Sequence, residues 1–260
     1  MRDSTHFTDP ERLRQQYGDS KRLRIRIDTH QRFAERKVAF YDWVLDQLDV
    51  RPGHLVADIG CGPGNYLDPL ASRGVRPFGA DLSRGMAAEA HALGFSTVVA
   101  DVQTLPFEDA TFDRVMCNHV LYHVPDQRRA LQELRRIARP TGRVLITTNG
   151  AEHLRVFYDL ARVAAADIGY DLPKRGPSPF TLEDVARVRE IFPDADVRRI
   201  ENRLVFQDPQ PALDYLHSWI GDTGPLKLAM RRRIEESIAR DGAFRVPTVS
   251  GCFVATVRRL

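Results

Sequence analysis

Carboxylates and glycines recur in this chain at points where apolar runs end. The run Leu55–Ile59 contains Asp58 and is followed by Gly60, Gly62 and Gly64 at alternate positions. It is too short for a helix and is typical of a buried parallel strand. Glycines permit a sharp turn and let a ligand lie against bare backbone, and a helix starting after them would point N–H groups at the same place. The pattern predicts a nucleotide-type site at the first strand–helix turn of an α/β sheet.

Two interpretations of this turn compete. A dinucleotide fingerprint requires Gly-x-Gly-x-x-Gly, but the position of the third glycine holds Asn65. The sequence Asp58-x-Gly60-x-Gly62-x-Gly64 instead resembles the first motif of the class I S-adenosylmethionine-dependent methyltransferases. The charge agrees, because a carboxylate repels a pyrophosphate but attracts the ammonium and sulfonium of S-adenosylmethionine. The methyltransferase interpretation is favoured, and a nicotinamide-linked oxidoreductase is disfavoured.

Two more carboxylates follow at strand–helix–strand spacing. The predicted strand 75–80 ends at Asp81, where a carboxylate can accept hydrogen bonds from both ribose hydroxyls of an adenosine. A helix cap is the alternative role, but Ser83 serves that cap well. The next predicted strand, 97–100, ends at Asp101. We therefore expect Asp81 and Asp101 at the same edge of the sheet as Asp58.

The segment 100–107 is similar to the family segment that recognises adenine. The resemblance implies that Asp101 accepts a hydrogen bond from the exocyclic amino group and that the backbone N–H of Val102 meets a ring nitrogen. Leu82 and Met86 would supply apolar faces, although methionine on a helix is more often core. The cofactor would be S-adenosylmethionine, and S-adenosylhomocysteine would be its product. The implied cofactor site consists of Asp58, Gly60, Cys61, Gly62, Asn65, Asp81, Leu82, Met86, Asp101, Val102 and Asn118.

A fourth predicted strand, 112–118, leads into a segment with two histidines. This stretch resembles the corresponding segment of many small-molecule methyltransferases, and it lacks the Pro-Pro-aromatic turn of enzymes that methylate amino groups of DNA. His119 and His123 have a spacing that could hold a metal on a helix, but no third ligand accompanies them and Pro125 disfavours a long helix. We expect no metal. His123, and secondarily His119, is a candidate general base near neutral pH; a packed histidine at a helix edge is the open alternative.

The first 50 residues carry helical periodicity and no catalytic motif. Apolar residues from His30 onward predict one amphipathic helix that ends near Asp49. In similar methyltransferases such a segment folds over the cofactor and encloses the acceptor, while packing against the core is the alternative. Candidate acceptor residues are Tyr17, Arg26, His30, Tyr122, Asn149 and His153. Aromatic residues on later predicted helices are further candidates: Tyr158, Tyr170, Tyr215 and Trp219.

The alternation of strands and helices predicts an α/β fold. The resemblance implies a Rossmann-like methyltransferase fold with a seven-stranded, mostly parallel sheet, an antiparallel last strand (252–257) and helices on both faces. Residues 197–200 are expected to form a further strand. We expect a single domain, 1–260, in which 1–50 form a helical lid, 51–150 the cofactor core, and 151–260 substrate-cap helices and sheet-completing strands.

Composition limits the classes of partner. The chain has 260 residues and a formal net charge of +3, which gives no positive case for nucleic acid. Its three cysteines form no Cys-x-x-Cys pair, so a disulfide framework is not expected. No apolar run approaches the ~20 residues that span a membrane. We expect a cytoplasmic protein, monomeric or homodimeric, with a small-molecule partner.

These observations favour transfer of a methyl group from S-adenosylmethionine to an oxygen, nitrogen or carbon nucleophile of a small molecule, such as a secondary metabolite. Alignment and exclusion of water would be the main contributions of the protein. A regulatory protein that binds the cofactor without turnover is the alternative from another class. Methylation of nucleic acid or protein is a weaker one.

Overall fold

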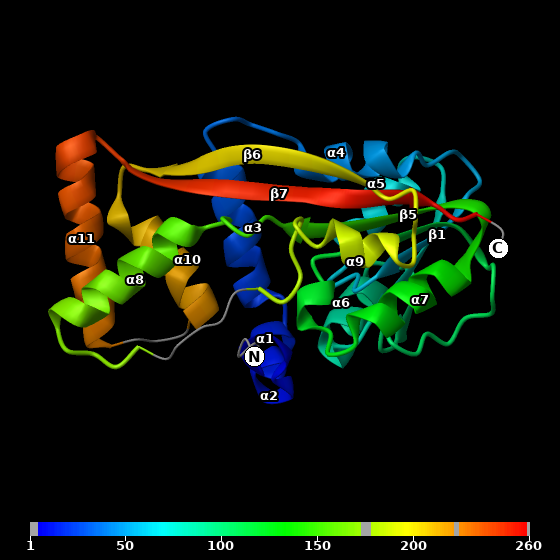
Figure 1. Ribbon diagram of the computed structural model, residues 1–260, viewed down its shortest axis with the longest axis horizontal. Coiled ribbons are helices and arrows are strands. Elements are labelled where there is room, and N and C mark those ends of the chain that lie inside the picture. The colour runs from blue at the N-terminus through cyan, green and yellow to red at the C-terminus, as the bar shows by residue number, and fades with distance from the viewer. Residues whose placement is uncertain (1–4, 173–177, 221–223, 259–260) are drawn as a thin grey trace.

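The computed structural model describes residues 5–172, 178–220 and 224–258. Its centre is one seven-stranded sheet in the order β3-β2-β1-β4-β5-β7-β6 (Figure 1). Strand β7 pairs antiparallel with β5 and β6, and the other pairs are parallel. The predicted sheet with its antiparallel last strand is thus confirmed. The strands are β1 (Leu55–Ile59), β2 (Arg76–Asp81), β3 (Ser96–Val99), β4 (Phe112–Asn118), β5 (Ala138–Asn149), β6 (Asp196–Phe206) and β7 (Phe244–Thr256).

Helices cover both faces of this sheet (Figure 1). On one face, Val115 of β4 packs in a cluster with Leu131 and Phe192; on the other, Val56 of β1 packs with Leu45 and Tyr66. The central strands are apolar on both sides because both faces are buried. The helices are α1 (Thr5–Thr8), α2 (Pro10–Tyr17), α3 (Lys21–Phe33), α4 (Phe40–Leu48), α5 (Leu67–Ala71), α6 (Arg84–Ala92), the 3₁₀ turn η1 (Leu121–His123), α7 (Gln127–Ile137), α8 (Arg155–Asp167), α9 (Val185–Arg189), α10 (Pro209–Ile220) and α11 (Pro225–Asp241).

The capping role predicted for Ser83 is confirmed. Its Oγ accepts a hydrogen bond of 3.3 Å from the N–H of Met86 in the first turn of α6. Asp126 caps α7 in the same way, accepting 2.9 Å from the N–H of Arg129. Both helices therefore begin immediately after the carboxyl edge of the sheet.

The prediction of one helix from His30 to Asp49 is wrong. The chain leaves the helical conformation after Phe33 and re-enters it at Phe40. Between these points Ala34 forms a bridge with Leu204 of β6, and the N–H of Glu35 donates to a carbonyl of the same strand over 2.9 Å. Because β6 lies at an edge of the sheet, its backbone groups are open to such a partner.

Strands β6 and β7 are longer than the sequence predicted, pairing from Asp196–Val254 to Phe206–Phe244. Their far ends extend past the other strands and are covered by α8, α10 and α11 (Figure 1). Residues such as Phe157, Leu216 and Val246 form a separate apolar cluster there. Pro247 within β7 and the polar residues around it concealed this extension, because proline is a poor indicator of strand.

The described residues contain no helix that is both long and apolar enough to cross a membrane. All three cysteines are free and buried.

Candidate functional site

Asp58 lies at the carboxyl end of β1 and is fully buried. The Nδ2 of Asn118, at the end of neighbouring β4, donates to its Oδ1 over 3.4 Å. Among the described residues no group bonds to the Oδ2 of Asp58 or to the Oδ1 of Asn118, although both atoms are buried. Burial raises the pKa of Asp58 to about 7; the Asn118 hydrogen bond lowers it, and Asp81 raises it further. Two buried acceptors without donors are an arrangement that a ligand with N–H donors would complete.

The glycine turn after β1 has the conformation that the sequence predicted. Gly60 has a φ of 76°, and a Cβ there would lie 2.1 Å from the Cγ2 of Val120. The N–H of Gly62 donates to the Oδ2 of Asp81 over 2.8 Å, and the N–H of Ser83 donates to its Oδ1 over 2.8 Å. Asp81 is thereby fixed opposite the turn, and each of its oxygens keeps capacity for a second donor.

Asp101 is positioned by a residue that sequence reasoning missed. Gln103 donates to the Asp101 carboxylate from its backbone N–H, at 2.8 Å, and from Nε2, at 3.1 and 3.0 Å. The Oε1 of Gln103 accepts from the N–H of Asp126 over 3.1 Å. A carboxylate bonding the backbone two residues on is a local turn that the sequence Asp101-Val102-Gln103 could have indicated. Gln103 thus connects the end of β3 to the start of α7.

Three predicted cofactor residues have their side chains in the core. The side chain of Cys61 packs beside Gly79, where a Cβ would lie 2.8 Å from its Sγ, and its N–H donates to the carbonyl of Ala80. The position of Cys61 therefore does not support a side-chain contact with a ligand. Met86 and Val102 are also buried, with 1% and 6% of their surface exposed.

Two other predicted cofactor residues are exposed. Leu82 has 64% of its surface exposed, directly after Asp81, as an apolar face for a ligand ring requires. Asn65 is exposed as well, but it lines a shallow surface depression with Pro63, Asp68 and Phe95. The structure therefore places Asn65 with a different group of residues from the one that surrounds Asp58.

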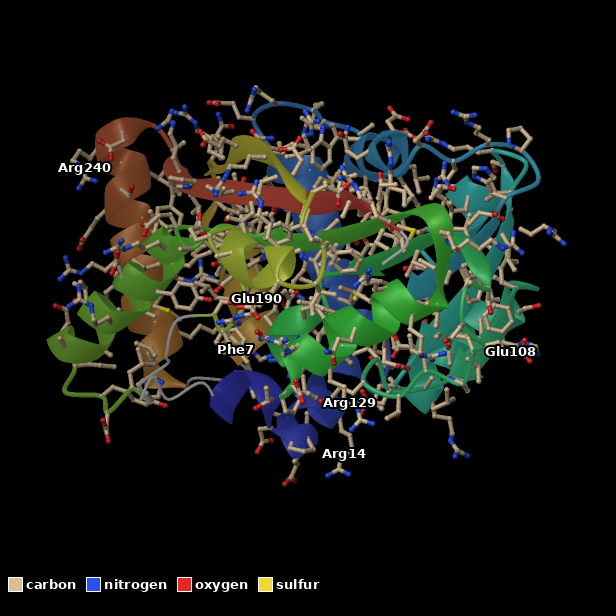
Figure 2. The ribbon with its side chains drawn as sticks, turned by 45° about the vertical axis from the view of Figure 1, so that its right-hand side comes forward. Phe7, Arg14, Glu108, Arg129, Glu190 and Arg240 are labelled. Carbon is tan, nitrogen blue, oxygen red and sulfur yellow. The ribbon has the colours of Figure 1, made fainter. Side chains whose placement is uncertain are left out.

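The N-terminal helices are held against the carboxyl edge through His123. Its Nδ1 lies 2.9 Å from the carbonyl of Phe7 and its Nε2 lies 3.0 Å from the Tyr17 hydroxyl. Nδ1 must donate to the carbonyl, so Nε2 accepts from the Tyr17 hydroxyl whenever the ring is neutral. Figure 2 shows Phe7 on the side of these helices that faces the body of the molecule and Arg14 pointing away from it. Both ring nitrogens of His123 are thus engaged, and the ring has no nitrogen left for direct contact with an acceptor in this arrangement.

Close backbone packing on α6 also holds this segment. The carbonyl of Gly18 lies so near Gly85 that a Cβ on Gly85 would be 2.2 Å from it. The Ser83 Oγ donates to the carbonyl of Tyr17 over 2.8 Å, and Glu89 accepts from the Ser20 hydroxyl over 2.6 Å. The segment is therefore seated beside the helix that starts after Asp81.

Basic side chains from three parts of the chain meet beside this edge. Arg26 and His30 come from α3, His119 follows β4, and His153 precedes α8. The rings of His30 and His153 stack with centroids 5.9 Å apart, and the His30 Nε2 lies 3.3 Å from the Tyr215 hydroxyl. His153 accepts at Nδ1 from the N–H of Val249 over 3.1 Å, so its Nε2 carries the hydrogen. The predicted acceptor residues Arg26, His30 and His153 are thus brought together with His119.

The three histidines of this cluster are neutral at physiological pH. Burial lowers the pKa of His30 to about 4. Burial, His30 and Arg26 lower that of His119 to about 4. Burial, His30 and His119 lower that of His153 well below its usual value. His119 also has a φ of 57°, which is uncommon outside glycine and often occurs at functional sites. With so low a pKa, His119 is a weak base.

Some of the other candidate acceptor residues lie within the site, and the rest lie away from it. Tyr122 lies within the site, its ring 4.4 Å from that of His123, and Tyr215 is buried beside His30. Asn149 ends β5, where its Oδ1 accepts from the hydroxyl of Ser250. Tyr170 is exposed, Tyr158 is partly buried on α8, and the Trp219 side chain lies outside what the structure describes. His119 precedes η1, so it does not share a helix with His123. No group of three or more His, Cys, Asp or Glu side chains in the described residues is arranged so that it could hold a metal ion.

The order of the strands and the helices on both faces of the sheet define a Rossmann-like fold. Residues 57–146 match the family model described as a methyltransferase domain. This match begins within β1, ends within β5 and includes Asp58, Asp81 and Asp101. This part of the chain is therefore similar to methyltransferase domains.

Curated relatives match part of the chain. The chain is 33% identical over 112 residues to a demethylmenaquinone methyltransferase of Corynebacterium efficiens, covering 43% of this chain and 49% of that one. It is 37% identical over 131 residues to an uncharacterised 37.1 kDa protein in transposon TN4556 of Streptomyces fradiae, covering 47% and 38%. The match thus spans less than half of each of these relatives.

A solved structure shows the same fold. Phosphoethanolamine N-methyltransferase 2 of Haemonchus contortus, in complex with S-adenosyl-L-methionine, superposes with a TM-score of 0.60 and 20% identity. The superposition covers 97% of this chain and 60% of that one.

Proposed function

We propose that this protein transfers the methyl group of S-adenosylmethionine to an oxygen, nitrogen or carbon nucleophile of a small-molecule acceptor. The observation that supports this most is the buried Asp58–Asn118 pair at the end of β1, whose Asp58 Oδ2 and Asn118 Oδ1 have no donor among the described residues. S-adenosylmethionine carries an ammonium group that supplies such donors, and its charge favours the ionised form of Asp58.

The remaining acidic residues fit the rest of the cofactor. Asp81, fixed by the N–H groups of Gly62 and Ser83, is proposed to accept from the ribose hydroxyls. Asp101, fixed by Gln103, is proposed to accept from the adenine amino group, with the exposed Leu82 against the ring. When bound, S-adenosylmethionine supplies a methyl group already activated by its sulfonium.

The chain itself is proposed to align the acceptor and exclude water. Residues 1–50 would act as a helical lid, 51–150 as the cofactor core and 151–260 as the acceptor cap with the strands that complete the sheet. Because both nitrogens of His123 are engaged, a proton taken from an acceptor would reach His123 through the Tyr17 hydroxyl, which lies 3.0 Å from Nε2. His123 is therefore proposed to act as a base only together with Tyr17.

The test is a binding and turnover measurement on the full chain. Titration with S-adenosylhomocysteine should show saturable binding, and methyl-labelled S-adenosylmethionine should transfer label to one member of a panel of phenols, amines and carboxylic acids. Absence of S-adenosylhomocysteine binding would refute the proposal. Tight binding with no transfer to any acceptor would favour the non-catalytic regulatory protein instead.

A further inference from the structure

Among the described residues, Arg26 has no anionic partner. Its Nε and Nη2 are buried and bond to no described group. Burial lowers the pKa of Arg26, but the phenols of Tyr17, Tyr215 and Tyr122, together with a side-chain hydrogen bond to Tyr17, raise it. The guanidinium carbon lies 5.4 Å from the centre of the Tyr17 ring. Such contact with an aromatic face compensates a buried charge only in part.

Elsewhere the chain supplies arginines with partners. Arg136, which is more exposed, donates to Glu133 over 2.7 Å and to Asp109 over 2.9 Å. Burying a guanidinium with two unmade hydrogen bonds is costly, and arginine cannot lose its charge to avoid that cost. An unfavourable buried charge of this kind is typical of a ligand-binding site, because the bound ligand supplies the missing hydrogen bonds.

The neighbours of Arg26 are suited to negative charge. His30, His119 and His153 add three imidazole rings that are kept neutral by burial and by one another. Each of the four side chains still keeps part of its surface accessible to solvent. An imidazole can donate from a ring nitrogen to an anion, and an anion favours its protonated form.

We propose that Arg26, His30, His119 and His153 bind an anionic group, a carboxylate or a phosphate monoester, on the methyl acceptor. This inference rests on the proposed methyltransferase function. The Nε and Nη2 of a guanidinium lie along one edge, so together they match two oxygens of such a group. Because Tyr17, at the end of α2, lies over the guanidinium of Arg26, the acceptor would enter while α1 and α2 are displaced and α3 stays in place.

The carboxylate of S-adenosylmethionine is a second source of the same chemistry. That carboxylate is joined to the ammonium through a single carbon, so it must lie beside the proposed ammonium site at Asp58. The titrations described below distinguish this source from the acceptor.

The test uses three matched probes on the intact protein saturated with S-adenosylhomocysteine: benzoate, phenyl phosphate and the neutral benzamide. Calorimetric titration should show that at least one anion binds at least tenfold more tightly than benzamide. Arg26→Gln should weaken that binding at least tenfold, and Arg26→Lys should weaken it less. Arg32→Gln, an exposed arginine of the same helix, should leave it unchanged. None of these variants should change the affinity for S-adenosylhomocysteine.

Several results would overturn the inference. These are equal binding of benzamide and the anions, no binding of either anion, or unchanged anion binding by a folded Arg26→Gln variant. Loss of S-adenosylhomocysteine affinity in Arg26→Gln, or competition between benzoate and S-adenosylhomocysteine, would assign Arg26 to the cofactor carboxylate instead. If the wild-type protein does not bind S-adenosylhomocysteine, the proposed function fails, and the same titrations without it still decide whether the anion site exists.

Discussion

The site has two halves, one around Asp58 and one formed by Arg26, His30, His119 and His153, and they differ in how a buried charge is avoided. At the end of β1, Asp58 is buried without a cation, and its pKa rises to about 7, so it can become neutral when no ligand is present. In the neighbouring cluster Arg26 cannot become neutral, and the histidines beside it lose their charge instead. The comparison suggests that one half is prepared for a cationic ligand and the other for an anionic one.

The halves also differ in how they are built. Asp58, Gly60 and Gly62 come from one continuous motif. The basic cluster comes from α3, the end of β4 and the segment before α8, which meet only in the folded chain. Close backbone packing fixes the glycine turn beside Asp58, so few substitutions fit there. The geometry of the basic cluster depends instead on where the N-terminal helices lie.

Replacement of Asp58 should have the largest effect. Asp58→Ala removes the carboxylate proposed to bind the ammonium, and charge-assisted hydrogen bonds of this kind are worth about 1.5–3 kcal/mol each. We expect S-adenosylhomocysteine affinity to fall about 100-fold by calorimetry, with Asp171→Ala as an exposed control. Equal affinity in both variants would mean that Asp58 does not contact the cofactor.

Affinity for S-adenosylhomocysteine should depend on pH through the same residue. Asp58 must be ionised to pair with an ammonium, and its pKa in the free protein is raised to about 7. Binding should therefore weaken as pH falls below 7, with a limiting slope of about tenfold per pH unit. Asp58→Asn should remove this slope. A wild-type affinity that is constant from pH 5.5 to 8 would show that Asp58 is already ionised in the free protein.

Removing the charge of Arg26 should stabilise the free protein. Arg26→Met keeps an unbranched apolar chain and removes a buried guanidinium that lacks an anion. Replacing buried charge with apolar groups is often neutral or stabilising by about 1–4 kcal/mol. We expect a higher midpoint of thermal unfolding than in the wild type, together with loss of benzoate or phenyl phosphate binding. A lower midpoint would indicate that Arg26 is a structural residue.

The smallest effect is expected at the contact that holds the N-terminal helices to η1. Tyr17→Phe removes the hydroxyl that donates to His123, worth about 0.5–1.5 kcal/mol for a neutral hydrogen bond. Cleavage of the N-terminal helices by a protease should become roughly fivefold faster, while S-adenosylhomocysteine affinity changes little. Tyr170→Phe, at an exposed tyrosine, is the control. A protease sensitivity equal to that of the control would show that this hydrogen bond does not hold the helices.

Much of the cofactor half was determined by sequence alone. The positions of β1, β2 and β4 along the chain, the glycine turn and the cap at Ser83 depend on local rules that act over a few residues, and the structure confirms them. The carboxylates Asp58, Asp81 and Asp101 follow apolar runs, and parallel strands bring their ends to one edge. Local spacing was therefore sufficient to predict where these groups lie.

Tertiary structure decided the rest. The break after Phe33 exists because β6 offers free backbone groups to Ala34 and Glu35, which no local pattern shows. His30 and His153 were separate candidates, and only folding stacks them beside Arg26 and deprives that arginine of a carboxylate. The charge and hydrogen-bonding state of a side chain depend on all the groups around it, and here His119 and His153 lie more than 80 positions after the residues of α3. The sequence by itself therefore determined the cofactor edge, and the folded chain decided the environment proposed for the acceptor.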